Sequence, residues 1–315
     1  MRSLAALATT AVLAVSLVGC SSSAANSCTP LANSGGSAVY SIQVTASAGQ
    51  APTATFPSPL KATKAEVKVI TPSEGQQILP GSAYSAELAL YNGETGESIA
   101  STAFNGTDLQ TDTLSQMSKF SFLNSALQCA REGSRIVGVI PNKELVNANG
   151  QSLTSGSTAM TLVVIADISS ASLARANGEQ QSIPDGFPKV VLDPKGVPGI
   201  TVPKTSPPTE LKIAVLKKGS GAEVTSTSDV VVHYTGVLWD TGAVFDSSWT
   251  KGTVATFNVG EVVPGFSQAL IGQKVGSQIL AVIPPNLAYG ATGAGTSVPP
   301  NATLVFVVDI LGIAK

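Results

Sequence analysis

The sequence predicts an α+β fold in which a curved antiparallel half-barrel of short strands wraps around one short helix. Val, Thr, Ser and Gly dominate the composition and helix formers are sparse, which favours many short strands. One segment, around residue 266, changes to the helical period. The apolar fraction of 43% is enough to build cores, and 315 residues are typical of about two domains.

The last third of the chain alternates between strand signals and turn signals. A tight turn is expected at Asp240–Gly242, and a short helix over 264–272, where Phe266 and Leu270 fall on one face. Five or six antiparallel strands around that helix imply the half-barrel. The predicted strands are 211–216, 230–238, 244–248, 256–259, 277–283 and 303–311.

The first residues look like an export signal that ends in a lipidation site. Leu4–Val18 is an apolar run of signal-peptide length, too short for a transmembrane helix. The run ends in Leu17–Cys20, which resembles the lipobox of bacterial lipoproteins. We expect a signal peptide over 1–19, lipidation of Cys20, a tether over 20–37, and extracytoplasmic domains that the lipid anchors to the bacterial cell membrane. An ordinary secretory signal with an incidental cysteine is the alternative.

Two cysteines remain once Cys20 carries a lipid. In an oxidising compartment, Cys28 and Cys129 are expected to form one disulfide, which would staple the start of the first domain to its middle. Two buried free thiols are the alternative, because the sequence gives no distance between the two sulfur atoms.

Composition and motifs exclude several classes of function. The net charge is −2 and no basic stripe appears, so nucleic acid is not expected as a partner. If Cys20 carries a lipid and Cys28 and Cys129 form a disulfide, one histidine remains of the usual zinc ligands, so we expect no metal. The chain has no nucleophile elbow, paired-cysteine set or HExxH motif, which argues against a hydrolase or a metalloenzyme, and no cofactor is expected.

Prolines mark the connection between two halves of the chain. The segment 169–207 is rich in proline and glycine, which predicts an extended linker rather than a core segment. It separates a domain over 38–168 from a domain over 208–315. The prolines of this region are Pro184, Pro188, Pro194, Pro198, Pro203, Pro207 and Pro208.

A loop of small residues near the C-terminus carries one aromatic side chain, Tyr289. No charged residue occurs between Ala288 and Pro300. This pattern indicates the rim of an apolar pocket with one polar group. A surface hairpin loop whose tyrosine packs on the sheet explains the same pattern.

Several separated motifs in the last third of the chain resemble the FKBP-type peptidyl-prolyl isomerases. In order, they are Val231–Gly236, Phe245–Ser248, Val262–Phe266, Ala288–Gly290 and Pro299–Phe306. The resemblance covers about residues 208–315. It implies the half-barrel fold and an enzyme that isomerises X-Pro bonds of exported proteins or peptides during protein folding.

The implied reaction needs no covalent chemistry. Rotation about an X-Pro bond faces a barrier of roughly 18–20 kcal/mol, because the amide loses resonance as it twists. A dry apolar pocket favours the twisted, less polar amide. By resemblance, the catalytic residues are Tyr289, which would donate a hydrogen bond to a substrate carbonyl, and Asp246, which would accept a hydrogen bond or polarise the substrate near the rotating amide.

The resemblance also implies which residues hold the proline ring. They are Tyr234, Phe245, Val262, Val263, Phe266 and Phe306. Each of these aromatic residues, taken alone, is equally well explained as part of the core. Asp246 is harder to explain in that way, because a buried carboxylate needs partners.

The motifs depart from the family pattern around the pocket. Phe266 stands where the family commonly has Trp, and Lys251 where a basic residue, often Arg, pairs with the acid. Ala255 replaces a frequent aromatic residue, and Ala294 and Ser297 stand where bulkier residues are frequent. These departures imply a shallower pocket. They support the alternative of a non-catalytic chaperone or peptide-binding lipoprotein.

The domain over 38–168 resembles a degenerate copy of the domain over 208–315. Leu123–Pro141 repeats several residues of Phe266–Pro284, which indicates the half-barrel fold a second time. This copy is expected to be inactive and to bind clients, position the active domain or act as a spacer. On this alignment, Leu88, Ile99, Ala100, Leu123, Val146 and Val164 replace Tyr234, Phe245, Asp246, Phe266, Tyr289 and Phe306.

Overall fold

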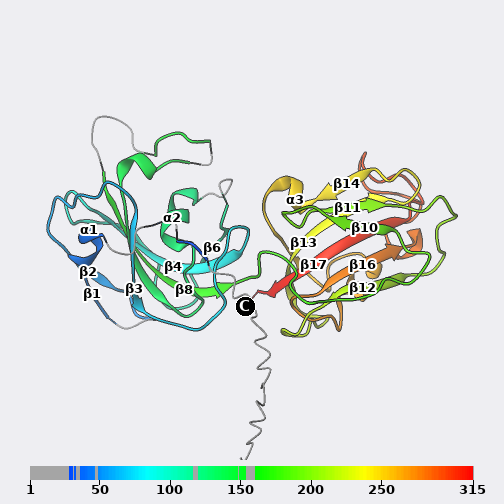
Figure 1. The fold of residues 1–315 in the computed structure, drawn as a ribbon, viewed down its shortest axis with the longest axis horizontal. Coiled ribbons are helices and arrows are strands. Elements are labelled where there is room, and N and C mark those ends of the chain that lie inside the picture. The colour runs from blue at the N-terminus through cyan, green and yellow to red at the C-terminus, as the bar shows by residue number, and fades with distance from the viewer. Residues whose placement is uncertain are drawn as a thin grey trace, which may run out of the picture.

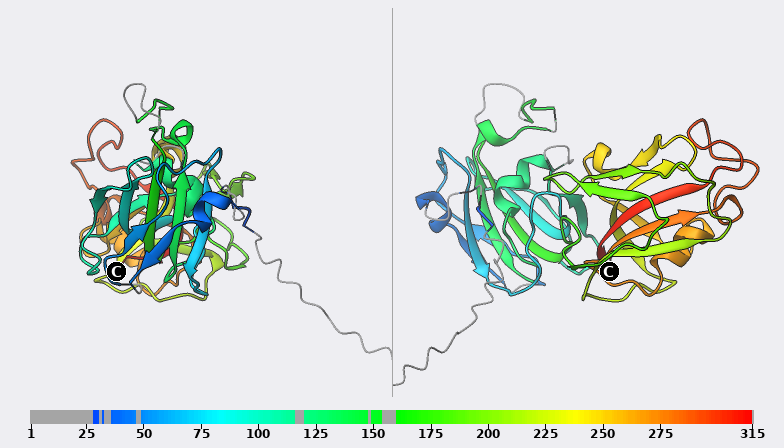
Figure 2. Two further views of the ribbon diagram at one scale, coloured as in Figure 1. Left: turned by 90° about the vertical axis from the view of Figure 1, so that its left-hand side faces the viewer. Right: turned by 45° about the vertical axis from the view of Figure 1, so that its right-hand side comes forward.

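The computed structural model contains two β-sheet units, one from each half of the chain (Figures 1 and 2). It describes residues 28–30, 32, 36–46, 49–115, 120–147, 149–153 and 160–314. The predicted signal peptide and the lipidation site Cys20 lie outside these residues. The expectation of antiparallel sheets with few helices is confirmed. Among the described residues, no helix has the length and hydropathy that crossing a bilayer requires.

The C-terminal sheet has the strand order β14-β13-β17-β16-β12-β9, and β15 pairs with β13. Every pairing is antiparallel. At the predicted turn, Gly242 has a positive φ and donates its N–H to the Leu238 carbonyl. The strands are β9 (Glu179–Gln180), β12 (Lys212–Lys218), β13 (Asp229–Leu238), β14 (Val244–Ser247), β15 (Ala255–Asn258), β16 (Gln278–Ile283) and β17 (Leu304–Ile313).

Helix α4 (Pro264–Leu270) packs against one face of this sheet. Proline fits its first turn, where the missing N–H removes no helical hydrogen bond. Phe266 and Leu270 point into the core beside buried residues of β13, β16 and β17. Each such side chain stabilises the fold by about 1.5–3 kcal/mol on burial. The sequence did not predict two single helical turns, α3 (Ser248–Lys251) and η3 (Pro285–Leu287).

The N-terminal sheet has the strand order β3-β7-β8-β4-β5, and β6 pairs with β4. Its inner face is covered by the short turns η1 (Ser121–Leu123) and α2 (Asn124–Leu127), and η2 (Asn142–Glu144) follows β7. The strands are β3 (Glu66–Thr71), β4 (Ala83–Asn92), β5 (Ser98–Ser101), β6 (Gln110–Thr113), β7 (Arg135–Ile140) and β8 (Leu162–Ala171).

The strands of the two sheets follow the same order. β4 takes the place of β13, β8 that of β17, β7 that of β16, and β3 that of β12. The register irregularities also coincide. One lies between Ser85 and Ala86 on β4, and its counterpart lies between Val231 and Val232 on β13.

The prediction of an extended linker over 169–207 is wrong. β10 (Lys189–Leu192) and β11 (Pro198–Thr201) pair as a hairpin, and β9 pairs with the edge of β12. The physical reason is that the outer face of the C-terminal sheet is itself apolar and requires cover. The covering side chains are Phe187, Val190, Ile200 and Val202.

A segment of the first half covers the outer face of the N-terminal sheet in the same way. It consists of α1 (Ser37–Tyr40), β1 (Gln43–Thr45) and β2 (Thr53–Thr55), with β1 and β2 paired. Val39 and Ile42 are buried against β7 and β8. Each sheet therefore has an inner face closed by a short helix and an outer face closed by the segment that precedes it.

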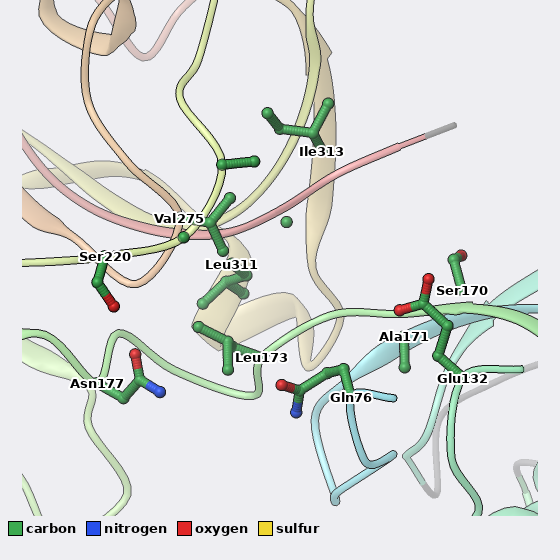
Figure 3. Close-up of a pocket in the computed structure, with 13 residues that line it drawn as sticks. Gln76, Glu132, Ser170, Ala171, Leu173, Asn177, Ser220, Val275, Leu311 and Ile313 are labelled. Atoms are coloured by element: carbon green, nitrogen blue, oxygen red, sulfur yellow. The ribbon is translucent and has the colours of Figure 1, made fainter. Parts of the chain in front are cut away.

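The two halves meet at a small apolar contact where β8 leads into the second half (Figure 1). The Leu173 N–H donates to the Leu311 carbonyl. The buried side chains of the contact are Ala83, Val231 and Leu311. A cavity of about 540 Å³ lies at this junction (Figure 3). Its lining includes Gln76 and Glu132 from the first half and Val275 and Ile313 from the second.

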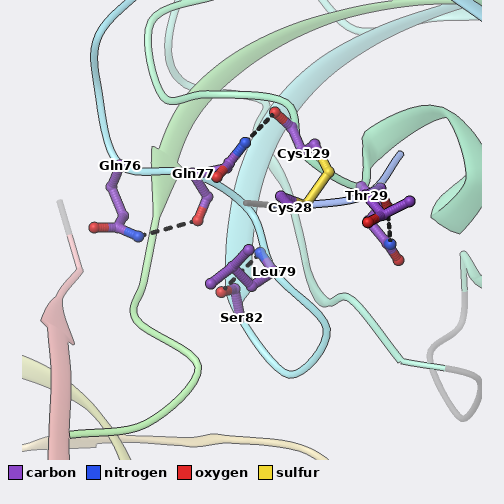
Figure 4. The surroundings of a disulfide bond; sticks show 8 residues. Cys28, Thr29, Gln76, Gln77, Leu79, Ser82 and Cys129 are labelled. Atoms are coloured by element: carbon purple, nitrogen blue, oxygen red, sulfur yellow. Dashed lines mark hydrogen bonds between the residues drawn. A yellow bond between two sulfur atoms is a disulfide. The ribbon is translucent and has the colours of Figure 1, made fainter. Parts of the chain in front are cut away.

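Cys28 and Cys129 form a disulfide bond (Figure 4). The two cysteines are 101 residues apart in the sequence. Beside the disulfide, the Gln128 Nε2 donates to the Thr29 carbonyl at 2.7 Å. Through the disulfide bond, residue 28 of the expected tether is fixed close to the end of α2.

Candidate functional site

Five aromatic rings lie in contact between the C-terminal sheet and α4. The Phe266 centroid lies 4.9 Å from that of Phe306 and 5.7 Å from that of Phe257, both in T-shaped geometry. The Phe245 ring meets Phe306 edge-on at 5.4 Å. Tyr234 lies 5.5 Å from Phe257 and 6.3 Å from Phe306. The sheet and the helix thus build one aromatic cluster from residues far apart in the sequence.

The predicted binding residues all belong to this cluster. Tyr234, Phe266 and Phe306 are buried in it. Phe245, Val262 and Val263 are half-buried and pack against it. Because these side chains are neither fully covered nor fully exposed, they offer an apolar surface that a small ring can reach.

Gly236 makes room for two of the rings. A Cβ at this position would lie 2.5 Å from Phe245 Cζ and 3.0 Å from Phe306 Cε1. The first distance is shorter than real carbon contacts allow, so a side chain here would displace the rings. The glycine is required by this close approach.

Asp246 is placed at the edge of the cluster by two hydrogen bonds. The Tyr234 hydroxyl donates to Asp246 Oδ2 at 2.5 Å, and Lys251 Nζ lies 2.6 Å from Oδ1. Burial acts to raise the pKa of Asp246, but the hydrogen bonds from Lys251 and Tyr234 outweigh it, so the pKa is lowered. The carboxyl group is therefore ionised at neutral pH. Burial and the hydrogen bond to Asp246 raise the pKa of Tyr234, which stays protonated.

Tyr289 lies at the rim rather than inside the cluster. Its side chain is 40% exposed, and it follows Ala288, which packs against the cluster. An exposed phenol beside an apolar surface is free to donate to a bound carbonyl group. Of the predicted catalytic pair, Asp246 is thus bonded to Tyr234 at the edge of the cluster, and Tyr289 adjoins it through Ala288.

Comparison with known proteins identifies relatives of the C-terminal half of the chain. A family model described as FKBP-type peptidyl-prolyl cis-trans isomerase matches residues 221–311. The FK506-binding protein of Streptomyces anulatus is 39% identical over 119 residues, which are 96% of that protein and 37% of this chain. The chain belongs to the FKBP-type peptidyl-prolyl cis-trans isomerase family.

Two further relatives match this chain over only part of their own length. The FKBP-type 22 kDa peptidyl-prolyl cis-trans isomerase of Escherichia coli is 50% identical over 103 residues, or 33% of this chain. The outer membrane protein MIP of Legionella longbeachae is 38% identical over 121 residues, or 38% of this chain. In both cases the match spans 50% of the relative.

Two residues of the candidate site were not predicted from the sequence. Phe257, which the sequence did not single out, contacts both Phe266 and Tyr234. It lies on β15 opposite Val230 of β13, a pairing that the sequence does not reveal. Ser248 is the second, because its hydroxyl accepts the Tyr234 N–H at 2.9 Å and so fixes the strand that carries the tyrosine.

His233 lies behind the FKBP-type site, on the opposite face of β13 from Tyr234. Its ring stacks on Trp249 with centroids 3.9 Å apart, and its Nδ1 lies 2.9 Å from the Ser248 hydroxyl. Burial lowers the pKa of His233 to about 4. The imidazole is therefore neutral at pH 7 and turned away from the aromatic cluster.

The loop over the FKBP-type site is held by backbone contacts. Ala294 and Val298 pair across it, and Gly293 takes a positive φ that leaves its Cβ position 2.4 Å from the Val298 carbonyl oxygen. A side chain at Gly293 would break this pairing. Ser297 is exposed. Ala294 and Ser297, which stand where the family frequently has bulkier residues, therefore leave less side-chain surface at the rim of the site.

The N-terminal sheet has different residues at the corresponding positions. Leu88 faces Ala166 in the register where Tyr234 faces Val308, and Ala100 faces Leu90 where Asp246 faces Gly236. The carboxylate and the aromatic rings are therefore missing from these positions. The described residues also contain no group of three or more His, Cys, Asp or Glu side chains placed to hold a metal ion.

Proposed function

We propose that the C-terminal unit catalyses cis–trans isomerisation of X-Pro bonds in exported polypeptides and so assists their folding. The observation that carries the proposal is the hydrogen bond from the Tyr234 hydroxyl to Asp246, at the edge of an aromatic cluster that includes Phe266. An apolar surface with one oriented carboxylate is what a twisting amide requires, and no nucleophile is needed.

Each group of the site has a part in this mechanism. The proline ring packs on Phe266 and Phe306, with Phe245, Val262, Val263 and Tyr234 around it. Tyr289 donates a hydrogen bond to a substrate carbonyl and fixes the backbone on one side of the rotating bond. Asp246 is ionised, and its negative charge lies near the amide whose resonance is being lost. The planar amide is more polar than the twisted one, so dry apolar surroundings lower the barrier.

An isomerisation assay on proline peptides tests the proposal. We expect Asp246→Ala and Tyr289→Phe each to lower kcat/KM about tenfold or more, which corresponds to losing one hydrogen bond to a charged or polarised group. Asp108→Ala and Tyr40→Phe are matched controls, because both residues are exposed and lie in the other half. Wild-type protein that is no faster than the Asp246→Ala variant would overturn the proposal.

A non-catalytic chaperone or peptide-binding lipoprotein is the second candidate. Ala255 and Ala294 leave the rim of the cluster without large side chains. Lys251, whose side chain is 61% exposed, contacts Asp246 through one ammonium group and not through the two parallel hydrogen bonds that an arginine can form. This candidate predicts that proline-containing peptides bind with an affinity that Phe266→Ala reduces, while turnover is absent in every variant.

The N-terminal unit is inferred to be a degenerate FKBP-like domain without activity. The shared strand order and the coincident register irregularities support this inference. A full chain that carries Asp246→Ala together with Tyr289→Phe should retain only the residual activity of its damaged C-terminal site. If Leu88→Ala in that chain lowered the remaining activity further, the first unit would be contributing catalysis.

The protein is further proposed to lie outside the cytoplasm, anchored by a lipid on Cys20. A relative of the FKBP-type region is itself described as an outer membrane protein, and Cys28 lies in a disulfide, which is typical of oxidising compartments. Labelling cells with a fatty acid should mark the wild-type protein and leave Cys20→Ala unmarked. Equal labelling of the two would exclude this cysteine as the site.

A further inference from the structure

A hollow of about 300 Å³ lies on the first unit, between α1, β3 and the end of α2. It is lined mainly by apolar side chains, yet two of them are turned to solvent: Tyr40 is 58% exposed and Val69 is 53% exposed. Val69 lies on β3 at the edge of the sheet, where polar side chains are ordinarily found, and Tyr40 lies at the end of α1. The other lining residues are Pro30, Val67, Lys68, Ala126, Gln128, Cys129, Ala130 and Ile136.

Lys68 is the one charged residue among those that line this hollow, and in the stretch before β3 the Ala65 N–H donates to the carboxylate of Glu144. Lys68 Nζ lies 5.1 Å from the centroid of the Tyr40 ring, and the stretch that leads into β3 carries the exposed residues Lys61 and Lys64. The carboxylate of Glu66, within the same stretch, is buried and accepts the Val39 N–H. That carboxylate therefore does little to offset the lysines at the surface.

The disulfide sets the distance from this hollow to the predicted lipid. Cys129 lines the hollow, and Cys28 is bonded to it. Cys28 follows Cys20 by eight positions (28 − 20 = 8). Fully extended, that segment reaches at most about 29 Å. A lipid on Cys20 would therefore keep the hollow close to the membrane surface at all times.

We propose that Tyr40, Val69 and the lysines 61, 64 and 68 form a docking surface for a membrane that contains anionic phospholipids. Tyr40 and Val69 enter the headgroup region, where aromatic and aliphatic side chains are stable, and the lysines face the phosphates. The chain as a whole has a net charge of −2, so the attraction comes from this local cluster and not from the overall charge. Docking adds a second contact to the lipid anchor and fixes which side of the first unit faces the bilayer.

This proposal rests on the proposed lipid anchor at Cys20 in one respect: the anchor explains why the surface is near a membrane. The surface itself is tested without the lipid. The chain from residue 21 onward keeps every described residue and carries no acylation site, so its binding reports the surface alone. Isomerase activity is not measured in this test, so a failure of docking and a failure of the proposed activity remain separate results.

The experiment measures co-sedimentation with vesicles of phosphatidylcholine, with or without phosphatidylglycerol. We expect binding only where phosphatidylglycerol is present, and its loss at high salt. Replacing lysines 61, 64 and 68 with serine should weaken binding by about fivefold for each lysine that lies at the surface. A Tyr40→Trp variant should be quenched by brominated lipid more than the wild type, whose own tryptophans, Trp239 and Trp249, lie in the second half.

A matched control comes from the hairpin of the second half. Lys189 and Val191 are an exposed lysine and an exposed valine on β10, and they correspond in type to Lys68 and Val69. We expect Lys189→Ser with Val191→Ser to leave vesicle binding unchanged, and Lys68→Ser with Val69→Ser to reduce it. The proposal is overturned if the chain does not bind anionic vesicles, or if both double variants bind equally well. Circular dichroism of each variant separates a lost surface from a lost fold.

Discussion

Leu90 in the first sheet occupies the register position that Gly236 occupies in the second. Leu90 faces Val164 on one neighbouring strand and Ala100 on the other, while Gly236 faces Phe306 and Asp246. The missing side chain of Gly236 is what admits the rings of Phe245 and Phe306. In the first sheet the large residue Leu90 lies between the smaller residues Val164 and Ala100. In the second sheet Gly236 lies between Phe306 and Asp246, so the two units differ at this position as well as at the ring positions.

Replacing Gly236 should consequently lower activity. We expect Gly236→Ala to lower kcat/KM by about tenfold or more, because a Cβ would lie 2.5 Å from the Phe245 ring and push it out of place. The overpacked site should also unfold more easily, by about 1–3 kcal/mol. Urea unfolding and the proline-peptide assay measure the two effects.

Gly199→Ala is the matched control for that experiment. Gly199 is also a strand glycine without a positive φ, and its nearest neighbour to an added Cβ is a carbonyl oxygen at 3.4 Å. Its replacement should leave activity unchanged. Full activity in the Gly236→Ala variant would show that the rings need not be where the structure places them.

The charge of Asp246 depends on its two partners. Because Lys251 and Tyr234 together lower the pKa of Asp246, removing either one should raise it, with the larger rise for Lys251→Met. Activity should be constant from neutral pH down to the lowered pKa and fall only as the carboxyl group protonates. NMR titration of the Asp246 carboxyl carbon checks the shifts. An unchanged pKa in both variants would contradict the two contacts.

Much of the C-terminal unit could be predicted from the sequence, because its strands are regular and its motifs are close together. The predicted helix over 264–272 appears as Pro264–Leu270, and the predicted strand over 230–238 as Asp229–Leu238. The hairpin of β10 and β11 was not predicted. Its prolines and glycines are typical of a linker, and only the apolar outer face of the sheet, which no local pattern reveals, explains why it folds back.

The candidate site was predicted for a different reason, namely resemblance. Tyr234 and His233 are neighbours on β13, and the alternation of a strand turns their side chains to opposite faces. The contacts of Phe257 and Ser248 depend on how β15 and α3 fold over β13, and a list of motifs does not contain that information. Gly236 appeared within a motif, but its need for a missing side chain is visible only with the rings in place.

His233 makes stability depend on pH. Its pKa is lowered from 6.5 to about 4 by burial, so between these values the unfolded chain binds more protons than the folded one. Stability from this group is complete above pH 6.5 and is lost as the pH falls toward 4, by about 3 kcal/mol at most. Asp309, its neighbour across the strands, acts in the opposite sense because burial raises its pKa.

The difference between wild type and His233→Gln isolates the histidine from Asp309. Glutamine does not titrate, and it keeps a polar group toward the Ser248 hydroxyl. We expect the difference in unfolding free energy to change between pH 4 and 6.5 and to be constant above that range. Since the chain has one histidine, its imidazole NMR signal gives the pKa directly. A pKa near 6.5 in the folded protein would contradict the burial.

The last prediction concerns Arg135, which is fully buried in the first unit. Its guanidinium donates to Asp167 at 2.5 and 2.7 Å and to the carbonyls of Ala46 and Gln50, so it ties the preceding segment to the sheet. At the corresponding position the second sheet has Gln278, which faces Asp309. Arg135→Gln leaves the Asp167 carboxylate buried without its cation, which should cost about 3–5 kcal/mol.

The two halves can be followed separately in that experiment. Both tryptophans, Trp239 and Trp249, lie in the second half, so their fluorescence reports that half, while circular dichroism reports both. Arg135→Gln should move the dichroism transition to lower urea and leave the fluorescence transition in place, because only a small apolar contact joins the halves. Arg175→Gln, at an exposed arginine, should shift neither by more than about 0.5 kcal/mol. A common shift of both signals in the Arg135 variant would instead mean that the two units unfold as one.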